Sequence, residues 1–294
     1  MFDLRYHVAS LAAVFLALII GILVGVGIAD RGLLDKGTRS LLEHQVADLR
    51  ARLDTATRQS AATDREQKAA QSYIKETYPK LVHNRLRGKH IALVFVGSVD
   101  GRIASALDRA LTDAGAQETR LRALKMPIDI PRLDTRLAAQ PAGDGYVGRS
   151  KLESLGRALG EELVSGGETP LWNALTDALI EERSGGSKLP VDGVIVVRTV
   201  PPQRDGTSRF LSGFYQGLTS AGLPAVGVET TDSSSSAVEA FGKAGLSTVD
   251  DVDEPSGRLA LVFLLAGAPG GHYGVKPSAD DPLPPMTNPF ARGG

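Results

Sequence analysis

HIALVFVG, residues 90–97, is a continuous apolar run that ends in glycine. Its length and its β-branched residues are typical of a strand buried on both faces of a sheet. The next segment repeats apolar residues at helical spacing: Ile103, Ala106, Leu107, Ala110 and Leu111. Gly115 closes this predicted helix. A buried strand followed at once by an amphipathic helix indicates a parallel sheet.

The same alternation continues along the chain. Further strands are predicted at 117–124, 193–200 and 225–229, with a last short one at 248–252. Helices are predicted at 150–164, 170–183, 209–221 and 235–244, and a long loop at 126–148. Residues 257–265 fit a strand or a helix, and we favour a helix because Pro255 and Ser256 offer a start signal.

This pattern predicts an α/β fold class. Residues 86–274 should form one doubly wound, Rossmann-like or flavodoxin-like domain with a mostly parallel sheet. Five prolines follow within residues 275–294, so we predict a disordered, Pro-rich tail there.

Residues 31–80, before the domain, are predicted to form a coiled coil. The seam residues are Leu42, Val46, Leu49 and Leu53, which alternate spacings of four and three. A single amphipathic helix docked on the domain is the alternative. We favour self-association, because a long polar helix has little else against which to bury its seam. Pro79 is expected to end or kink the helix.

Residues 1–30 are predicted to contain a single transmembrane helix. Residues 8–29 are uncharged, and at 1.5 Å per residue they would extend roughly 33 Å, about the thickness of a bilayer's hydrocarbon core. A cleaved secretory signal usually has a shorter apolar region, although Gly25, Gly27 and Ala29 would suit a peptidase. We favour a retained anchor over a cleaved signal or a buried core helix.

Two glycines within this span are spaced for close helix packing. Gly21 and Gly25 lie four residues apart, as in membrane-helix dimers, although isolated glycines are also common in such helices. Arg31, Lys36 and Arg39 follow the span and Arg5 precedes it, a count of Lys and Arg that weakly opposes an exported domain. The segment before the span is very short, so charge alone does not settle the orientation.

The composition excludes several classes of function. The 294 residues include 33 Lys plus Arg and 34 Asp plus Glu, so no basic field predicts a nucleic-acid partner. The absence of cysteine excludes disulfides and thiolate metal sites. No nucleophile motif of the G-x-S-x-G type is present, and we predict no catalytic residue and no resident cofactor.

The loop that follows the first strand is a candidate ligand site. Residues 97–102 read GSVDGR, and ligands bind at the carboxyl ends of such strands. The segment matches neither common phosphate-binding fingerprint. Turn glycines and a helix cap explain the segment equally well.

An acidic cluster near the C-terminus is a weak candidate for metal binding. Asp250, Asp251, Asp253 and Glu254 could bind a hard cation, but the EF-hand spacing is absent, and capping of the next helix is the simpler interpretation. His272 lies in a glycine-rich loop, and we retain His272, Asp250 and Asp251 as weak metal candidates. His83 and His90 need not converge.

Two segments resemble a known family. LRYHVASLAAVFLALIIGILVGVG (4–27) and LSTVDDVDEPSGRLALVFLLAGAPGGHYG (246–274), with the coil after the first, are similar to the mycobacterial copper transport protein B (MctB) family. The resemblance covers about residues 1–276. It implies copper homeostasis or copper transport across the cell envelope, with copper as the transported or bound ion, and a large domain outside the cytoplasm.

Three hypotheses follow. The first is a membrane-anchored envelope protein with the family's role in copper homeostasis, assembled as a homodimer or higher homo-oligomer. The second is a non-catalytic, dimeric coiled-coil scaffold that engages an envelope protein or the cell-division machinery. The third is a small-molecule-binding domain that uses the loop after the first strand.

Overall fold

The computed structural model describes residues 4–29, 35–185 and 188–285, with side chains for 11–25, 41, 43–185 and 188–285. The chain divides into two compact units, Met1–Ala69 and Ala70–Gly294.

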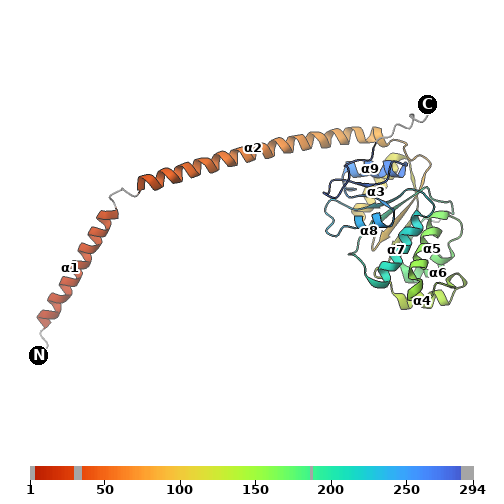
Figure 1. The fold of residues 1–294 in the computed structure, drawn as a ribbon, viewed down its shortest axis with the longest axis horizontal. Helices are drawn as coiled ribbons and strands as arrows, with labels where there is room; N and C mark the ends of the chain where they lie inside the picture. The colour runs from red at the N-terminus through yellow and green to blue at the C-terminus, as the bar shows by residue number, and fades with distance from the viewer. Residues whose placement is uncertain (1–3, 30–34, 186–187, 286–294) are drawn as a thin grey trace. The chain divides into compact units, whose positions relative to one another are not determined.

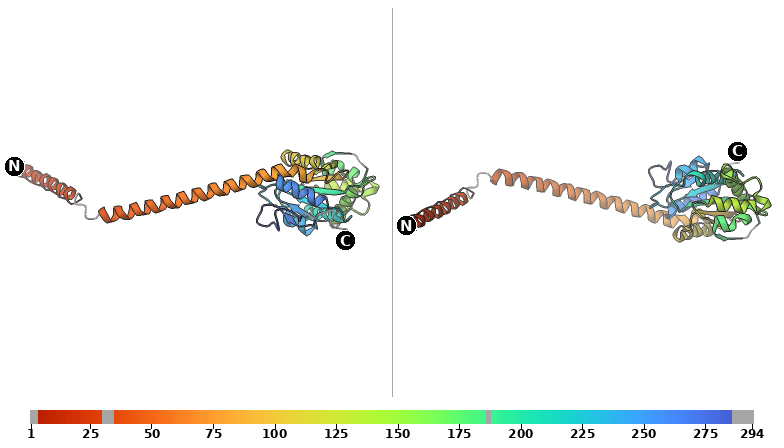
Figure 2. Two further views of the ribbon diagram at one scale, coloured as in Figure 1. Left: turned by 90° about the horizontal axis from the view of Figure 1, so that it is seen from above. Right: turned by 90° about the horizontal axis from the view of Figure 1, so that it is seen from below.

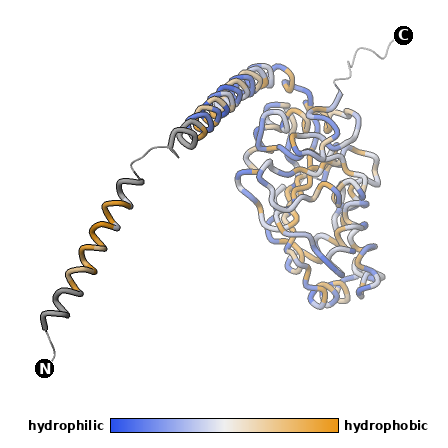
Figure 3. The backbone as a smooth tube through the Cα atoms, turned by 60° about the vertical axis from the view of Figure 1, so that its left-hand side comes forward, coloured by the Kyte–Doolittle hydropathy of each residue, from blue (hydrophilic) through white to orange (hydrophobic). Residues whose placement is uncertain are grey.

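Helices account for the described part of the first unit. α1 spans Leu4–Ala29, and α2 spans Asp35–Val82 and continues into the second unit. The described stretch of α1 is hydrophobic all round, whereas α2 mixes polar and apolar positions (Figure 3). Where side chains are described, no helix is both long enough and apolar enough to cross a membrane.

The predicted seam on α2 faces solvent within this chain. Val46, Leu49 and Leu53 are 42%, 64% and 67% exposed. The side chain of the remaining seam residue, Leu42, lies outside the described residues. These seam residues therefore pack against nothing in the described part of the chain. The coiled coil stays a prediction.

The second unit is built on a largely parallel sheet. The described residues form seven strands: β1 (His90–Val96), β2 (Gln117–Leu124), β3 (Ile180–Ser184), β4 (Gly193–Arg198), β5 (Ala225–Val228), β6 (Ser247–Val249) and β7 (His272–Tyr273). Their order is β3-β2-β1-β4-β5-β6-β7, and every neighbouring pair is parallel except the antiparallel pair β2–β3. This arrangement confirms the predicted α/β class.

Helices cover both faces of the sheet (Figures 1 and 2). One face packs against α4 (Ile130–Ala138), α5 (Leu152–Ser165), α6 (Pro170–Leu179), α7 (Asp205–Thr219) and α8 (Val238–Lys243). The other packs against α3 (Gly101–Ala114), α9 (Pro255–Leu265) and the last turns of α2. The central strand β1 contributes to both cores, because its side chains alternate between the two faces.

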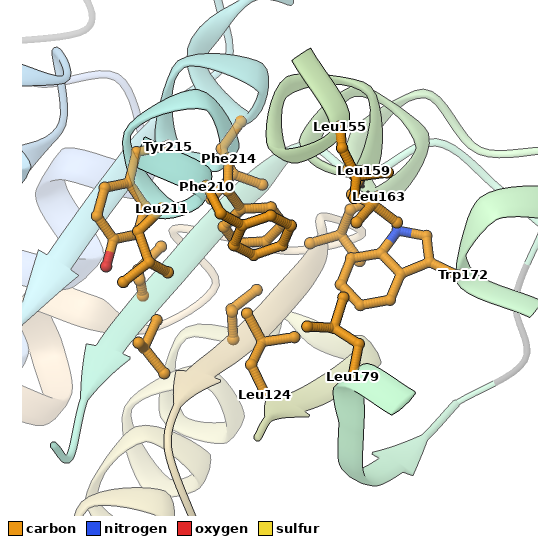
Figure 4. Packing of buried hydrophobic residues seen from close by; sticks show 14 of the residues in the cluster. Leu124, Leu155, Leu159, Leu163, Trp172, Leu179, Phe210, Leu211, Phe214 and Tyr215 are labelled. Carbon is orange, nitrogen blue, oxygen red and sulfur yellow. Dashed lines mark hydrogen bonds between the residues drawn. The ribbon is translucent and has the colours of Figure 1, made fainter. Parts of the chain in front are cut away.

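Aromatic side chains fill the core beneath α5 and α7 (Figure 4). The Phe214 ring meets Trp172 edge-on at 6.0 Å and lies parallel to Phe210 at 6.2 Å. The Trp172 indole N–H donates to the Leu159 carbonyl at 2.9 Å, so its buried polar atom is satisfied.

Glycines set the distance between α5 and α7. Gly156 and Gly160 on α5 face Gly213 and Gly217 on α7. A Cβ added at Gly213 would overlap the Glu153 carbonyl, and one at Gly156 would overlap the Phe210 carbonyl. The two backbones therefore approach as closely as in the small-xxx-small crossings of membrane helices.

Two local predictions were wrong. The predicted loop at 126–148 contains α4, because Pro131 occupies the first turn of that helix, where a missing N–H costs nothing, and the Asp129 carboxylate caps it. The predicted helix at 170–183 ends at Leu179, because the residues after it pair with β2 as an antiparallel edge strand.

Pro79 does not end α2, which continues to Val82. Tyr78 and Val82 are 6% and 0% exposed, so burial of the last turn outweighs the hydrogen bond that proline lacks. By contrast, Gly115 closes α3 in the left-handed conformation, as predicted.

The structure also differs from the predicted tail. Residues 275–285 lie along β7: the Asp280 N–H donates to the His272 carbonyl, and the Gly274 N–H donates to the Asp281 carbonyl. Leu283 packs against the buried core. Proline content alone therefore misjudged these residues, whereas 286–294 lie outside the described residues.

Candidate functional site

Ligands of doubly wound sheets usually bind where the strand order reverses, here between β1 and β4. In this chain, the start of the loop after β1 is covered by side chains of the protein. A Cβ added at Gly97 would lie 2.5 Å from Thr199 Oγ1 and 2.6 Å from Val200 Cγ1, so these side chains from the loop after β4 close over the glycine.

Asp100 occupies the positive end of α3. Its carboxylate accepts from the Arg102 N–H at 2.9 Å and the Ile103 N–H at 3.1 Å. This geometry matches the capping interpretation of the 97–102 segment, because a side chain of the chain itself already satisfies the N–H groups that an anion would bind.

The acidic cluster lies at the carboxyl end of β6, and its members have different partners. Asp250 is fully buried, lies 2.9 Å from His272 Nε2 and accepts from the Val275 N–H at 2.9 Å. It therefore holds the segment after β7 against the sheet. Asp253 accepts from the N–H and hydroxyl of Thr231, and Glu254 is the N-cap residue of α9.

His272 uses both ring nitrogens. Nδ1 lies 2.8 Å from the Ser278 carbonyl oxygen, which can only accept, so Nδ1 carries a proton. Nε2 lies 2.9 Å from an Asp250 carboxylate oxygen. A metal ion could bind this histidine only by displacing one of these hydrogen bonds.

Asp251 points away from the other two metal candidates. It is fully buried and accepts from the Ser256 hydroxyl at 2.7 Å, and its Oδ1 has no hydrogen-bond partner in the part of the chain that is described. Burial, reinforced by the negative charges of Asp250, Asp253 and Glu254, raises the pKa of Asp251 to about 6, against the hydrogen bond from Ser256.

A buried ion pair completes this end of the sheet. Glu229, directly after β5, is 5% exposed and pairs with Lys276 Nζ at 2.6 Å. Its carboxylate also accepts from the Ser236 hydroxyl and the Ala237 N–H, each at 2.9 Å. The network joins the ends of β5, β6 and β7 and has the character of a structural clamp.

The structure brings Asp250 and His272 together and separates Asp251 from them. Within the described residues, no group of three or more His, Asp or Glu side chains could hold a metal ion. His83 lies 2.9 Å from the Asn84 side chain, whereas His90 lies beside Asp192, so these two histidines do not form a common site.

Two open cavities flank the loop between β4 and α7, a region that the sequence analysis did not select. One of about 420 Å³ has Arg149, Arg204 and Arg209 on its wall. The other, of about 280 Å³, lies between α7 and α8. The sequence offers one sign of this region, the arginine that ends the apolar strand 193–198. The cavity beside that arginine forms only where two helices pack together, so the sequence alone does not show it.

The fold defines a class: an α/β domain with a doubly wound sheet, preceded in the chain by one apolar helix and one long amphipathic helix. The family described as "Copper transport outer membrane protein, MctB" matches residues 1–284, and the chain belongs to this family. The resemblance inferred from the sequence is thereby confirmed.

Two relatives, each named "Copper transporter MctB", come from Mycobacterium bovis and Mycobacterium tuberculosis. Each is 28% identical to this chain over an alignment of 321 positions, which covers 94% of this chain and 96% of the relative. The similarity therefore extends over both units and is not confined to the sheet domain.

Proposed function

We propose that this chain is a non-enzymatic, membrane-anchored protein of the cell envelope that contributes to copper homeostasis. The family match over residues 1–284 carries this proposal, because it includes the apolar helix, the amphipathic helix and the domain together. The relatives' printed name supplies the connection to copper transport.

The proposed anchor is the uncharged segment 8–29, which forms most of α1. Its described large apolar side chains, between residues 11 and 24, are each more than half exposed in the single chain. Such a surface is costly in water and favourable in hydrocarbon. We place the sheet domain on the outer side of the membrane, in keeping with the family's description as an outer membrane protein.

The proposed assembly uses α2. Leu49 and Leu53 are about two-thirds exposed, and they lie four residues apart on one face of a helix that is rich in polar residues. A second copy of α2 would bury this seam by interlocking side chains. We therefore infer a homodimer or higher homo-oligomer, in which copper handling is a property of the assembly.

A scaffold is the second candidate. The solvent-exposed seam on α2 also suits a coiled-coil partner from the envelope or the cell-division machinery. Such a protein would need no copper ligands, and its loss would alter cell separation without altering copper tolerance.

A gene deletion separates the two proposals. We expect the deletion strain to be copper-sensitive and to hold more copper per cell, with the wild-type gene restoring both measures. Leu49→Asp with Leu53→Asp should fail to restore them, because two charges in the seam oppose assembly. Ala47→Asp with Ala51→Asp, on the outer face of the same helix, is the matched control. Normal copper tolerance and copper content in the deletion strain would exclude the copper role.

A further inference from the structure

The cavity of about 280 Å³ between α7 and α8 has the features of a small-molecule site. Arg198, the last residue of β4, lies at its base. α7 contributes one face at helical spacing, with Ser208, Leu211, Ser212 and Tyr215, and α8 contributes Ala240, Lys243 and Ala244. Pro202 and Gln203 complete the rim.

Tyr215 is a buried polar side chain that has no partner. It is 4% exposed, it lines the cavity, and its hydroxyl makes no hydrogen bond to any residue that the structure describes. Edge-on packing against Phe241 at 5.3 Å fixes the ring. Burial raises the pKa of Tyr215, against the opposing effect of Arg198, so the hydroxyl remains a donor at neutral pH.

Arg198 is a half-buried cation without an acidic partner among the described residues. Its Nη2 donates to the carbonyls of Ser235 and Ser236, at 3.1 and 2.7 Å, which fixes the guanidinium in place. Its Nε is buried and has no hydrogen-bond partner in the described chain. Arg198 and Tyr215 therefore line one cavity, and each has a donor that the described chain leaves without a hydrogen-bond partner.

The charges around the cavity indicate a single negative charge on the ligand. Lys243, at the rim, is already paired with Glu239 one turn earlier on α8. Arg198 therefore supplies the one uncompensated positive charge among the lining residues. Leu211, Pro202 and the two alanines add apolar surface to the same lining. An anionic head group with an apolar body fits both halves of the lining.

We propose that this cavity binds a small organic monoanion, whose carboxylate is held by Arg198 and Tyr215 and whose apolar body lies against Leu211. The site is separate from the loop after β1 and from the Asp250–His272 contact, and it does not depend on the copper role.

The test measures binding of benzoate and of hexanoate to the full-length protein in detergent by titration calorimetry. We expect saturable binding of at least one of them, with a Kd of about 1 mM. Benzyl alcohol, which has a similar body without the charge, should bind at least about tenfold more weakly.

Tyr215→Phe separates binding from folding. It retains the ring that packs against Phe241 and removes only an unpartnered hydroxyl, so the melting temperature should not fall, whereas the affinity should fall about fivefold. Arg198→Met should abolish binding, and Arg209→Met, an exposed arginine on the neighbouring cavity, is its matched control.

Any of three results would overturn the proposal. One is the absence of saturable binding of both carboxylates up to about 10 mM. Another is equal affinity in the wild type, Tyr215→Phe and Arg198→Met, which would place the ligand elsewhere on the protein. Equal binding of benzyl alcohol would likewise show an apolar hollow without selectivity for charge.

Discussion

The α5–α7 crossing and α1 carry the same spacing of glycines with opposite surroundings. In the crossing, Gly156 and Gly213 lie against the backbone of the facing helix. In α1, a Cβ added at Gly21 or Gly25 would meet no described atom within 4 Å beyond its own stretch of helix. Small residues four apart therefore mark a surface that admits another helix, but they do not say whether that helix belongs to the same chain.

The same contrast separates the two units. The sheet domain buries its apolar side chains in two cores on either side of the sheet. The described part of the first unit leaves large apolar residues exposed, both on α1 and along the seam of α2. Substitutions in the domain should consequently change folding, and substitutions in α1 or α2 should change association.

Gly213→Leu should have the largest effect. Its side chain would overlap the Glu153 carbonyl, so α5 and α7 would have to separate and open the aromatic core beneath them. We expect a loss of more than about 4 kcal/mol in the free energy of unfolding, measured by chemical denaturation followed by circular dichroism. Gly21→Leu is the control, and an equal loss there would contradict the contrast between the two helices.

Removal of the segment along β7 should be the next most damaging. A chain that ends at residue 276 loses three backbone hydrogen bonds of His272 and Gly274 and the packing of Leu283. Compared with a chain that ends at residue 285, it should be less stable by about 3 kcal/mol. Equal melting temperatures for the two chains would show that the segment contributes nothing to the domain.

Asp251→Asn should change the pH dependence of stability. The wild-type pKa of this carboxyl rises from 3.8 to about 6 on folding. Between these values the folded state holds a proton that the unfolded chain has lost, so wild-type stability falls as the pH rises through this window and stays lower above it. The decrease amounts to about 2–3 kcal/mol for this group.

The asparagine variant lacks this decrease. Its free energy of unfolding relative to the wild type should therefore increase from pH 4 to pH 7, measured by urea unfolding at a series of pH values. Asp64→Asn, exposed on α2, controls for the loss of one negative charge. A constant difference between the Asp251 variant and the wild type across this range would refute the assignment.

Gly25→Leu should have the smallest effect. We expect it to change only the association of α1 helices. A Cβ added at Gly25 would meet no described atom outside its own stretch of helix, so unfolding of the sheet domain should be unchanged. If two α1 helices approach at this glycine, the larger side chain should weaken their association in a membrane-based reporter by about 1 kcal/mol. The control is Leu23→Ile, which keeps the size of an exposed apolar residue.

The strands and helices with strong local signals were predictable from the sequence. β1 is buried throughout from Ile91 to Val96, and α9 begins at the proline that suggested its start. Helix α4 and strand β3 were missed for different reasons. Pro131 looked like a loop residue although it suits a first helical turn, and β3 exists because the edge of β2 offers hydrogen bonds.

The site was less predictable than the fold. The sequence analysis selected His272, Asp250 and Asp251 because their side chains can bind metals. In the structure His272 contacts Asp250, whereas Asp251 contacts Ser256 instead. Arg198 and Tyr215 belong to no common sequence motif. They line one cavity because the end of β4 and one face of α7 lie together. Such a pairing depends on tertiary packing, which no local spacing encodes.

The most direct test is the mass of the full-length protein in detergent, measured by sedimentation with the detergent contribution subtracted, for the wild type and for Leu49→Asp with Leu53→Asp. We predict a dimer or higher oligomer for the wild type, and a shift toward monomer for the double variant with unchanged unfolding of the sheet domain. A wild-type protein that stays monomeric at high concentration, or a double variant that assembles as the wild type does, would contradict the proposed self-association of α2.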